Sequence, residues 1–99
     1  MVRIAITKST LKNKKYKAVF YKDNNQKIKT SHFGDSRYDD YTTHKDKERR
    51  RLYRARTIKS LNKGNYMSPS HLSYYILWGD STNINTNIKK YKSKFKLEK

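Results

Sequence analysis

The sequence has 99 residues, of which 25 are Lys or Arg and eight are Asp or Glu, so its formal net charge is +17. It lacks cysteine, which excludes a disulfide framework, a catalytic thiol and a cysteine-ligated zinc site. No apolar run approaches the roughly 18 residues of a membrane span, and no signal peptide is recognisable, so we expect an intracellular or virion-internal protein rather than a secreted one.

The length favours one small basic domain, residues 1–99, in which residues 1–13 form a short strand or an arm. Only 33% of the residues are hydrophobic, so the core must be thin. A charge of this density strains a compact fold and calls for a polyanionic partner. Nucleic acid is the first candidate, an acidic protein is the second, and we do not expect a membrane partner.

Two alternating stretches, residues 16–21 and 27–33, predict antiparallel strands rich in β-branched and aromatic residues. Asp and Asn at 23–25 supply the turn between them, because both tolerate the left-handed backbone of a tight hairpin. An isolated hairpin is only marginally stable in water, so we expect it to pack against other elements.

After a polar loop, the sequence predicts a helix that is capped by Thr43 or Asp46 and runs to about Leu61. Acidic residues occupy its first turn and basic residues follow, as the helix dipole prefers. We expect residues 62–65 to end it. Apolar residues at helical spacing indicate the face that packs on the core: Leu52, Ala55, Ile58 and Leu61.

Two shorter helices are predicted next. In the first, Ser68 is the expected cap, Pro69 is the first helical residue, and Gly79 ends the helix. Ser81 is the expected cap of the second. The residues expected to pack inward are Leu72, Tyr75, Ile76 and Trp78 in one helix and Ile84, Ile88, Tyr91 and Phe95 in the other. The predicted fold is therefore α+β: a β-hairpin or small antiparallel sheet followed by three helices.

Arginine is concentrated in one segment, since five of the seven arginines lie within residues 44–56. A guanidinium forks onto phosphate or carboxylate, so the cluster predicts a phosphate-facing helix. Two alternatives stay open: an Arg–Asp network that locks the helix onto the preceding loop, and an inert solvated surface. The candidate phosphate contacts are Arg49, Arg50, Arg51, Arg54 and Arg56.

Lysines of the hairpin alternate with aromatic residues, a pattern that suits single-stranded nucleic acid or a ribbon in a duplex groove. The same lysines could instead only protect a sheet edge. The further candidate contacts are Lys15, Lys17, Lys27 and Lys29 in the hairpin and Lys89 and Lys90 in the last helix.

An acidic group in the loop before the arginines could hold Mg²⁺ in a nuclease: Asp35, Asp39, Asp40, His44 and Asp46. Its spacing matches no nuclease motif, and such residues are more often turn and cap residues. The sequence has no Gly-rich phosphate loop and no nucleophile elbow. We therefore expect no enzyme, no catalytic residue, no metal or other cofactor, and no small-molecule substrate.

Several stretches carry a resemblance to known proteins: KKYKAVF at 14–20, KIKTSHFG at 27–34, DYTTHKDKER at 40–49 and LSYYILW at 72–78. Together they resemble an uncharacterised family of small basic proteins of large and giant double-stranded DNA viruses. The resemblance runs from about Lys14 to Leu97, leaves out Met1 to Asn13, and is most specific in the pattern HFG…DYTxHKDxER. It implies a viral protein, made late and packaged, and no activity or catalytic residue can be transferred from it.

These observations predict a non-enzymatic, largely sequence-independent nucleic-acid-binding viral protein, with DNA as its partner, located in the virion or the host-cell interior. The alternative is a minor structural component of the virus particle that binds acidic protein partners.

Overall fold

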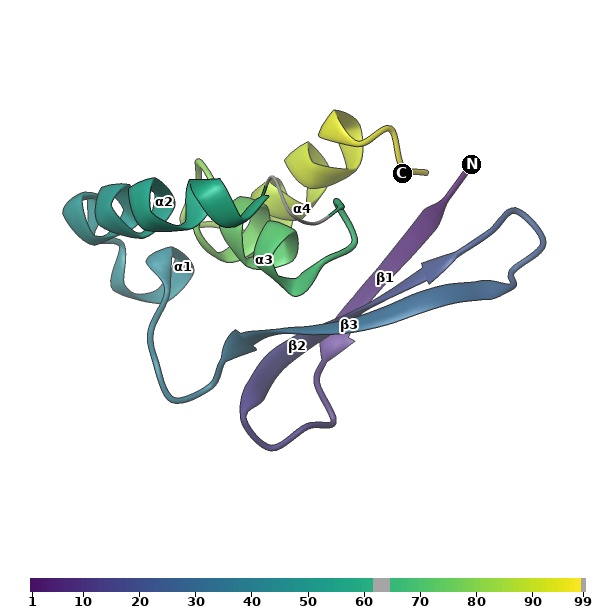
Figure 1. The fold of residues 1–99 in the computed structure, drawn as a ribbon, viewed down its shortest axis with the longest axis horizontal. Helices are drawn as coiled ribbons and strands as arrows, with labels where there is room; N and C mark the ends of the chain where they lie inside the picture. Colours follow the sequence, from purple (N-terminus) through teal and green to yellow (C-terminus); the bar gives the residue numbers. More distant parts are fainter. Residues whose placement is uncertain (62–64, 99) are drawn as a thin grey trace.

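The computed structural model describes residues 1–61 and 65–98 and shows an α+β fold (Figure 1). Three antiparallel strands form one sheet in the order β1-β2-β3: β1 is Arg3–Lys8, β2 is Lys14–Tyr21 and β3 is Lys27–Asp35. The helices follow in the sequence, as predicted. Residues 1–13 contain an edge strand of the sheet, so the strand alternative, rather than an arm, describes this segment.

The predicted hairpin is present as β2 and β3. The turn is closed by hydrogen bonds between Lys22 and Gln26 and between Asn25 and Lys22, and Asn25 has a φ of 62°, the left-handed backbone expected there. Ala18 and Phe20 are fully buried on the face of the sheet that the helices cover, because strand residues two apart share a face.

The loop after β3 contains a helix that was not predicted, α1, Tyr41–His44. Asp40 caps it by accepting hydrogen bonds from the backbone and hydroxyl of Thr42, and Thr43 closes a reciprocal capping box with the backbone of Asp40. Lys45 follows with a φ of 59° and turns the chain into the next helix, α2, Lys47–Leu61. The predicted end of α2 at 62–65 lies largely outside the described residues.

The predicted start at Ser68 is confirmed, because its side chain accepts a hydrogen bond from the His71 amide and Pro69 is the first helical residue. This helix, α3, Pro69–Leu72, continues directly as a π-helical segment, η1, Ser73–Leu77. The cap predicted for the last helix is wrong. The last helix, α4, Ile84–Lys94, starts one residue after Asn83. Asn83 is therefore the cap in place of Ser81, and its side chain accepts hydrogen bonds from the first amides of the helix.

The core lies between the sheet and the layer formed by α3, η1 and α4, which cover one face of the sheet (Figure 1). Its buried residues are Ile4, Ala18, Phe20, Phe33, Leu72, Ile76, Leu77, Tyr91 and Leu97. The predicted inward stripe of α4 is confirmed, with Tyr91 buried and Ile84, Ile88 and Phe95 half-buried against the core. The two ends of the chain meet, because the Glu98 amide donates to the carbonyl of Val2 over 2.8 Å.

The apolar stripe predicted for the arginine-rich helix is wrong as a core contact. Leu52 and Ile58 are 49% and 51% exposed, Ala55 is exposed as well, and α2 has no fully buried residue. The helix packs through a different and largely polar face, described below. In the described part of the chain, no helix combines the length and the apolar character needed to cross a bilayer.

Candidate nucleic-acid interface

The arginine-rich helix α2 starts at a cap that the sequence predicted. Asp46 accepts hydrogen bonds from the amides of Glu48, 3.0 Å, and Arg49, 3.2 Å. The Asp46 amide in turn donates to Nδ1 of His44 over 2.9 Å. The acidic group of Asp46 therefore stabilises the start of the helix and is not an ion-pair partner for its arginines.

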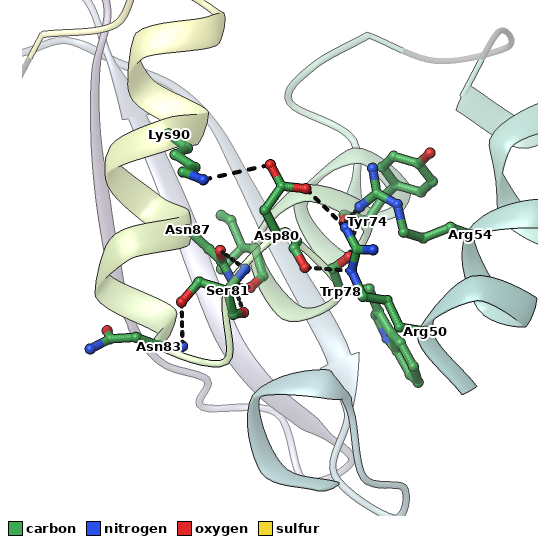
Figure 2. Close-up of polar contacts among 11 residues, drawn as sticks. Arg50, Arg54, Tyr74, Trp78, Asp80, Ser81, Asn83, Asn87 and Lys90 are labelled. Carbon is green, nitrogen blue, oxygen red and sulfur yellow. Dashed lines mark hydrogen bonds and ion pairs between the residues drawn. The ribbon is translucent and has the colours of Figure 1, made fainter. Parts of the chain in front are cut away.

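Arg50 anchors α2 to the segment between η1 and α4 (Figure 2). Its Nε donates to the Gly79 carbonyl over 2.7 Å, and its Nη2 donates to Asp80 over 2.9 Å. Lys90 of α4 lies on the other oxygen of Asp80 at 3.6 Å, so one carboxylate links two helices. Only 25% of the Arg50 side chain is exposed, which leaves little of its guanidinium for a ligand.

Arg54 makes a second anchor one helical turn later. One nitrogen, Nη1, donates to the carbonyls of Tyr74, 3.0 Å, and Trp78, 2.6 Å, and the guanidinium lies 3.9 Å from the centre of the Tyr74 ring. Carbonyls at the end of a helix lack partners within the helix and carry partial negative charge, so a cation there is stabilising. Arg54 thus supplies donors to carbonyls at the end of η1.

An aromatic pair lies between the two anchors. The rings of Tyr53 and Trp78 stack, with 4.2 Å between their centres and 10° between their planes. The centre of the His44 ring lies 5.1 Å from that of Trp78. Because Arg50, Tyr53 and Arg54 are three and four residues apart, they share the face of α2 that packs on the protein. Burial raises the pKa of the Tyr53 hydroxyl.

These contacts show that two of the five candidate phosphate contacts of this helix, Arg50 and Arg54, bind the protein itself. The network resembles the Arg–Asp alternative, but it locks α2 onto the end of η1 and the segment after it, and not onto the preceding loop as that alternative expected. Its acceptors are backbone carbonyls and Asp80, and not the acids of the preceding loop. Arg51 is paired on the surface with Glu48 at 2.6 Å, and that pair lowers the pKa of the Glu48 carboxyl.

Arg49 and Arg56 differ from the other three arginines. Both are exposed, and neither forms an ion pair within the residues that the structure describes. The Arg56 guanidinium lies 5.8 Å from the centre of the Tyr53 ring. Three exposed lysines of the same segment likewise lack an ion pair among the described residues: Lys45, between α1 and α2, and Lys47 and Lys59 on α2.

Arg49 and Arg56 also line a cleft of about 590 Å³ between α2, the start of α3 and the end of the sheet. Its lining residues are Lys14, Lys15, Phe33, Gly34, Asp35, Tyr38, Asp39, Asp40, Arg49, Leu52, Tyr53, Arg56, Pro69, Ser70, Ser73, Leu77 and Trp78. Among these, Lys15 and the buried Asp40 form a partly buried ion pair at 2.6 Å.

The structure distributes the predicted lysines over several surfaces. Lys15 forms an ion pair with Asp40, and Lys17 of β2 lies beside His32 of the neighbouring strand β3. Lys27 and Lys29 are exposed near the tip of the hairpin, at the end of the molecule opposite α2 (Figure 1). Lys89 and Lys90 are exposed on α4, where Lys90 faces Asp80. The eleven predicted contacts therefore do not form one continuous surface.

The acidic residues considered for a metal have structural contacts instead. Arg37 donates two side-chain hydrogen bonds to Asp35 and holds the pKa of that carboxyl at about 2. Asp40 and Asp46 cap α1 and α2. Within residues 1–61 and 65–98, no three His, Asp or Glu side chains are grouped so that they could hold a metal ion.

The fold and this interface define a small basic α+β protein that presents a cationic helix on its surface. Residues 4–57 match the model of a family of unknown function, DUF5754, and the chain belongs to that family. The match starts within β1 and ends in α2. It therefore includes most of β1, which the expected resemblance left out, and stops before α3 and α4, which the expected resemblance included. No curated protein and no solved structure matches the chain significantly.

Sequence reasoning missed the residues that hold α2 in place. Asp80 was not singled out. Trp78 was expected to pack inward and does pack against the core, but its stack with Tyr53 was not predicted. One signal was available, because the spacing of Arg50, Tyr53 and Arg54 places them on one helical face. The π-helical end of η1, whose carbonyls Arg54 binds, has no comparable signal in the sequence.

Proposed function

We propose that this protein binds nucleic acid without catalysis and largely without sequence preference, through the outward face of α1 and α2. One observation carries the proposal. After the ion pairs of the described residues are assigned, five exposed cations on this segment have no acidic partner: Lys45, Lys47, Arg49, Arg56 and Lys59. Contacts from such side chains to phosphates carry no sequence information, so affinity should depend little on sequence.

The docking of α2 supports this use. The helix has 15 residues, a length of about 22 Å, and it is held at one face only, so its opposite face is accessible along the whole length. The major groove of DNA is wide enough to admit an α-helix. Because Arg50 and Arg54 fix the helix to the body of the protein, the remaining cations are presented in a fixed arrangement.

A viral setting is part of the proposal. The resemblance to small basic proteins of large double-stranded DNA viruses implies DNA as the partner and packaging in the particle as the context. A protein of this charge could neutralise packaged DNA by releasing its counterions.

The test is a mobility-shift titration of the full chain against duplex DNA over a range of salt concentrations. Binding through phosphates gives a log–log slope of roughly −0.9 for each phosphate neutralised. The double substitution of Arg49 and Arg56 by Gln should weaken binding to unrelated sequences equally and reduce the slope by about 2. A slope near zero for the unmodified protein would refute the proposal.

A matched control removes the same charge at the other end of the molecule. Substitution of Lys27 and Lys29 by Gln at the hairpin tip should change affinity less than the double substitution in α2. An equal loss from both pairs would show that net charge, and not the α2 surface, determines binding.

A second function has one observation in its favour. Leu52 and Ile58 expose about half of their side chains beside the unpaired cations, and an apolar row flanked by positive charge fits an acidic protein partner. The protein would then be a minor structural component of the particle. Affinity purification with and without nuclease treatment separates the two functions, because only the protein partner should persist after nuclease.

A further inference from the structure

The cleft beside α2 differs from the outward face of the helix in both shape and charge. Its volume of about 590 Å³ lies in the range of small-ligand sites, which is roughly 300–1,000 Å³, and a duplex cannot enter a space of this size. Two of its three carboxylates already have cationic partners, because Asp40 is paired with Lys15 and Asp35 with Arg37. The lining carries four cations against these three carboxylates, so its net charge is only weakly positive, and this does not suit a run of phosphates.

The walls of the cleft combine apolar and aromatic side chains with charged ones. Phe33 and Leu77 are buried beneath it, and Leu52 and Tyr53 form its side on α2. An apolar part beside polar groups that fix the orientation of a ligand is typical of small-ligand sites.

Tyr38 adds an exposed ring at the same cleft. It is 66% exposed, which is unusual for a large aromatic residue, and it belongs to the loop between β3 and α1. The guanidinium of Arg37 lies 5.9 Å from the centre of the ring. Nucleobases stack on exposed aromatic rings of this kind, and each stacked base contributes about 1–3 kcal/mol.

The anionic part of the ligand has its own contacts. Arg49 and Arg56 are seven residues apart on α2, which places them on the same side of the helix about 10 Å apart along its axis. Both line the cleft and lack ion pairs within the described part of the chain. A guanidinium binds phosphate through paired hydrogen bonds, so either arginine can hold a phosphate while a ring occupies the apolar part of the cleft.

We propose that this cleft holds one unpaired nucleotide, with its base against Tyr38 and the apolar wall and its phosphate on Arg49 or Arg56. This inference rests on the proposed function and makes it more specific, because it assigns an unpaired nucleotide of a single strand to the cleft. Arg49 and Arg56 are exposed and also line the cleft, so they take part in both kinds of contact, whereas Tyr38 belongs to the cleft alone. The shared ligand chemistry is a base carrying a phosphate, in a strand or as a free nucleotide.

The protein contains its own reporter for this site, because Trp78 is the one tryptophan of the chain and lines the cleft. Tryptophan fluorescence of the full chain is titrated with a single-stranded oligothymidylate, a duplex of matching length and thymidine monophosphate. We expect the single strand to change the fluorescence at saturation and the duplex to change it little.

Substitutions at Tyr38 test the stacking. Tyr38→Ala should lower affinity for the single strand about tenfold and leave duplex affinity within about twofold, whereas Tyr38→Phe keeps the ring and should retain affinity for both. Arg56→Gln should also weaken single-strand binding more than Arg51→Gln, since Arg51 does not line the cleft and is paired with Glu48.

The outcomes separate this inference from the proposed function. If Tyr38→Ala leaves single-strand affinity unchanged, or lowers both affinities equally, while the salt slope stays steep, the cleft proposal is refuted and the proposed function stands. If no salt-dependent binding is found for any nucleic acid, both fail. Binding of the monophosphate as tight as that of the strand, with the same dependence on Tyr38, would support the cleft and assign it to free nucleotides.

Discussion

The Arg54 guanidinium lies over the ring of Tyr74, 3.9 Å from its centre, while one of its nitrogens donates to the carbonyl of the same residue. The second acceptor, the Trp78 carbonyl, lies one turn further along the chain. Arg54 therefore joins α2 to the end of η1 through a cation–π contact and two hydrogen bonds, all from a half-buried side chain.

Arg54→Ala should lower the free energy of unfolding by about 3 kcal/mol, because it leaves two carbonyls without their donor and removes the contact with Tyr74. Arg54→Lys should recover only part of this loss, since an ammonium lacks the planar fork. Urea denaturation measures the change. Arg51→Ala is the control and should cost far less than Arg54→Ala, because its pair with Glu48 is exposed to solvent. Equal losses at both positions would contradict the assignment.

The strands, the turn and the caps at Asp46 and Ser68 were predictable because their signals are local. Alternation along β2 and β3, turn residues at 23–25 and a Ser-Pro helix start each act within a few residues. Local geometry alone determines these features.

The docking of α2 was not predictable because its partners are remote. The apolar stripe of Leu52 and Ile58 was the stronger periodic signal. The observed contacts instead join Arg50 to the Gly79 carbonyl, 29 residues away, and Arg54 to the Tyr74 carbonyl, 20 residues away. Those carbonyls lie in η1 and in the segment that follows it, where helical hydrogen-bond partners are lacking. Composition did predict an excess of surface cations, but not which arginines would remain at the surface.

This docking leads to a prediction about the apolar residues of α2. Leu52→Gln and Ile58→Gln should each change the free energy of unfolding by less than about 0.5 kcal/mol, because about half of each side chain is already exposed. Leu72→Ala should cost about 2–5 kcal/mol, since Leu72 is fully buried in the core. Thermal or urea unfolding of the three variants tests this, and a loss above about 2 kcal/mol at Leu52 would restore the core assignment.

His71 should make stability depend on pH near neutrality. Its ring is buried, Nδ1 lies 2.7 Å from the Ser68 hydroxyl, and burial lowers its pKa below the ordinary value of 6.5. The unfolded chain therefore binds a proton at a higher pH than the folded protein does. The contribution of His71 is fully present above about pH 6.5 and is lost as the pH falls from there toward the folded pKa.

The measurement is the free energy of unfolding at several pH values from about 8 to 5, together with the titration of the three histidines by NMR. His71→Asn should be less stable at high pH but should show a smaller decrease across this window. A titration of His71 at or above 6.5 would contradict the prediction.

Asn87 is fully buried, and its side chain forms hydrogen bonds with three backbone groups (Figure 2). Its amide nitrogen donates to the carbonyls of Ile76, 2.9 Å, and Ser81, 2.7 Å, and its oxygen accepts from the Ser81 amide over 3.0 Å. These bonds hold the end of η1 against the start of α4.

Asn87→Asp keeps the shape of the side chain and replaces the donor with an oxygen that faces two carbonyls. We expect a loss of about 3 kcal/mol or more at neutral pH, measured by urea denaturation, because a buried carboxylate oxygen that faces two carbonyl oxygens and lacks a donor is strongly unfavourable. Asn85→Asp is the matched control on the same helix. Asn85 is exposed in the first turn of α4, where negative charge interacts favourably with the helix dipole, so the variant should be as stable as the unmodified protein or slightly more so. Similar losses for the two variants would show that added negative charge in α4, and not the burial of Asn87, causes the effect.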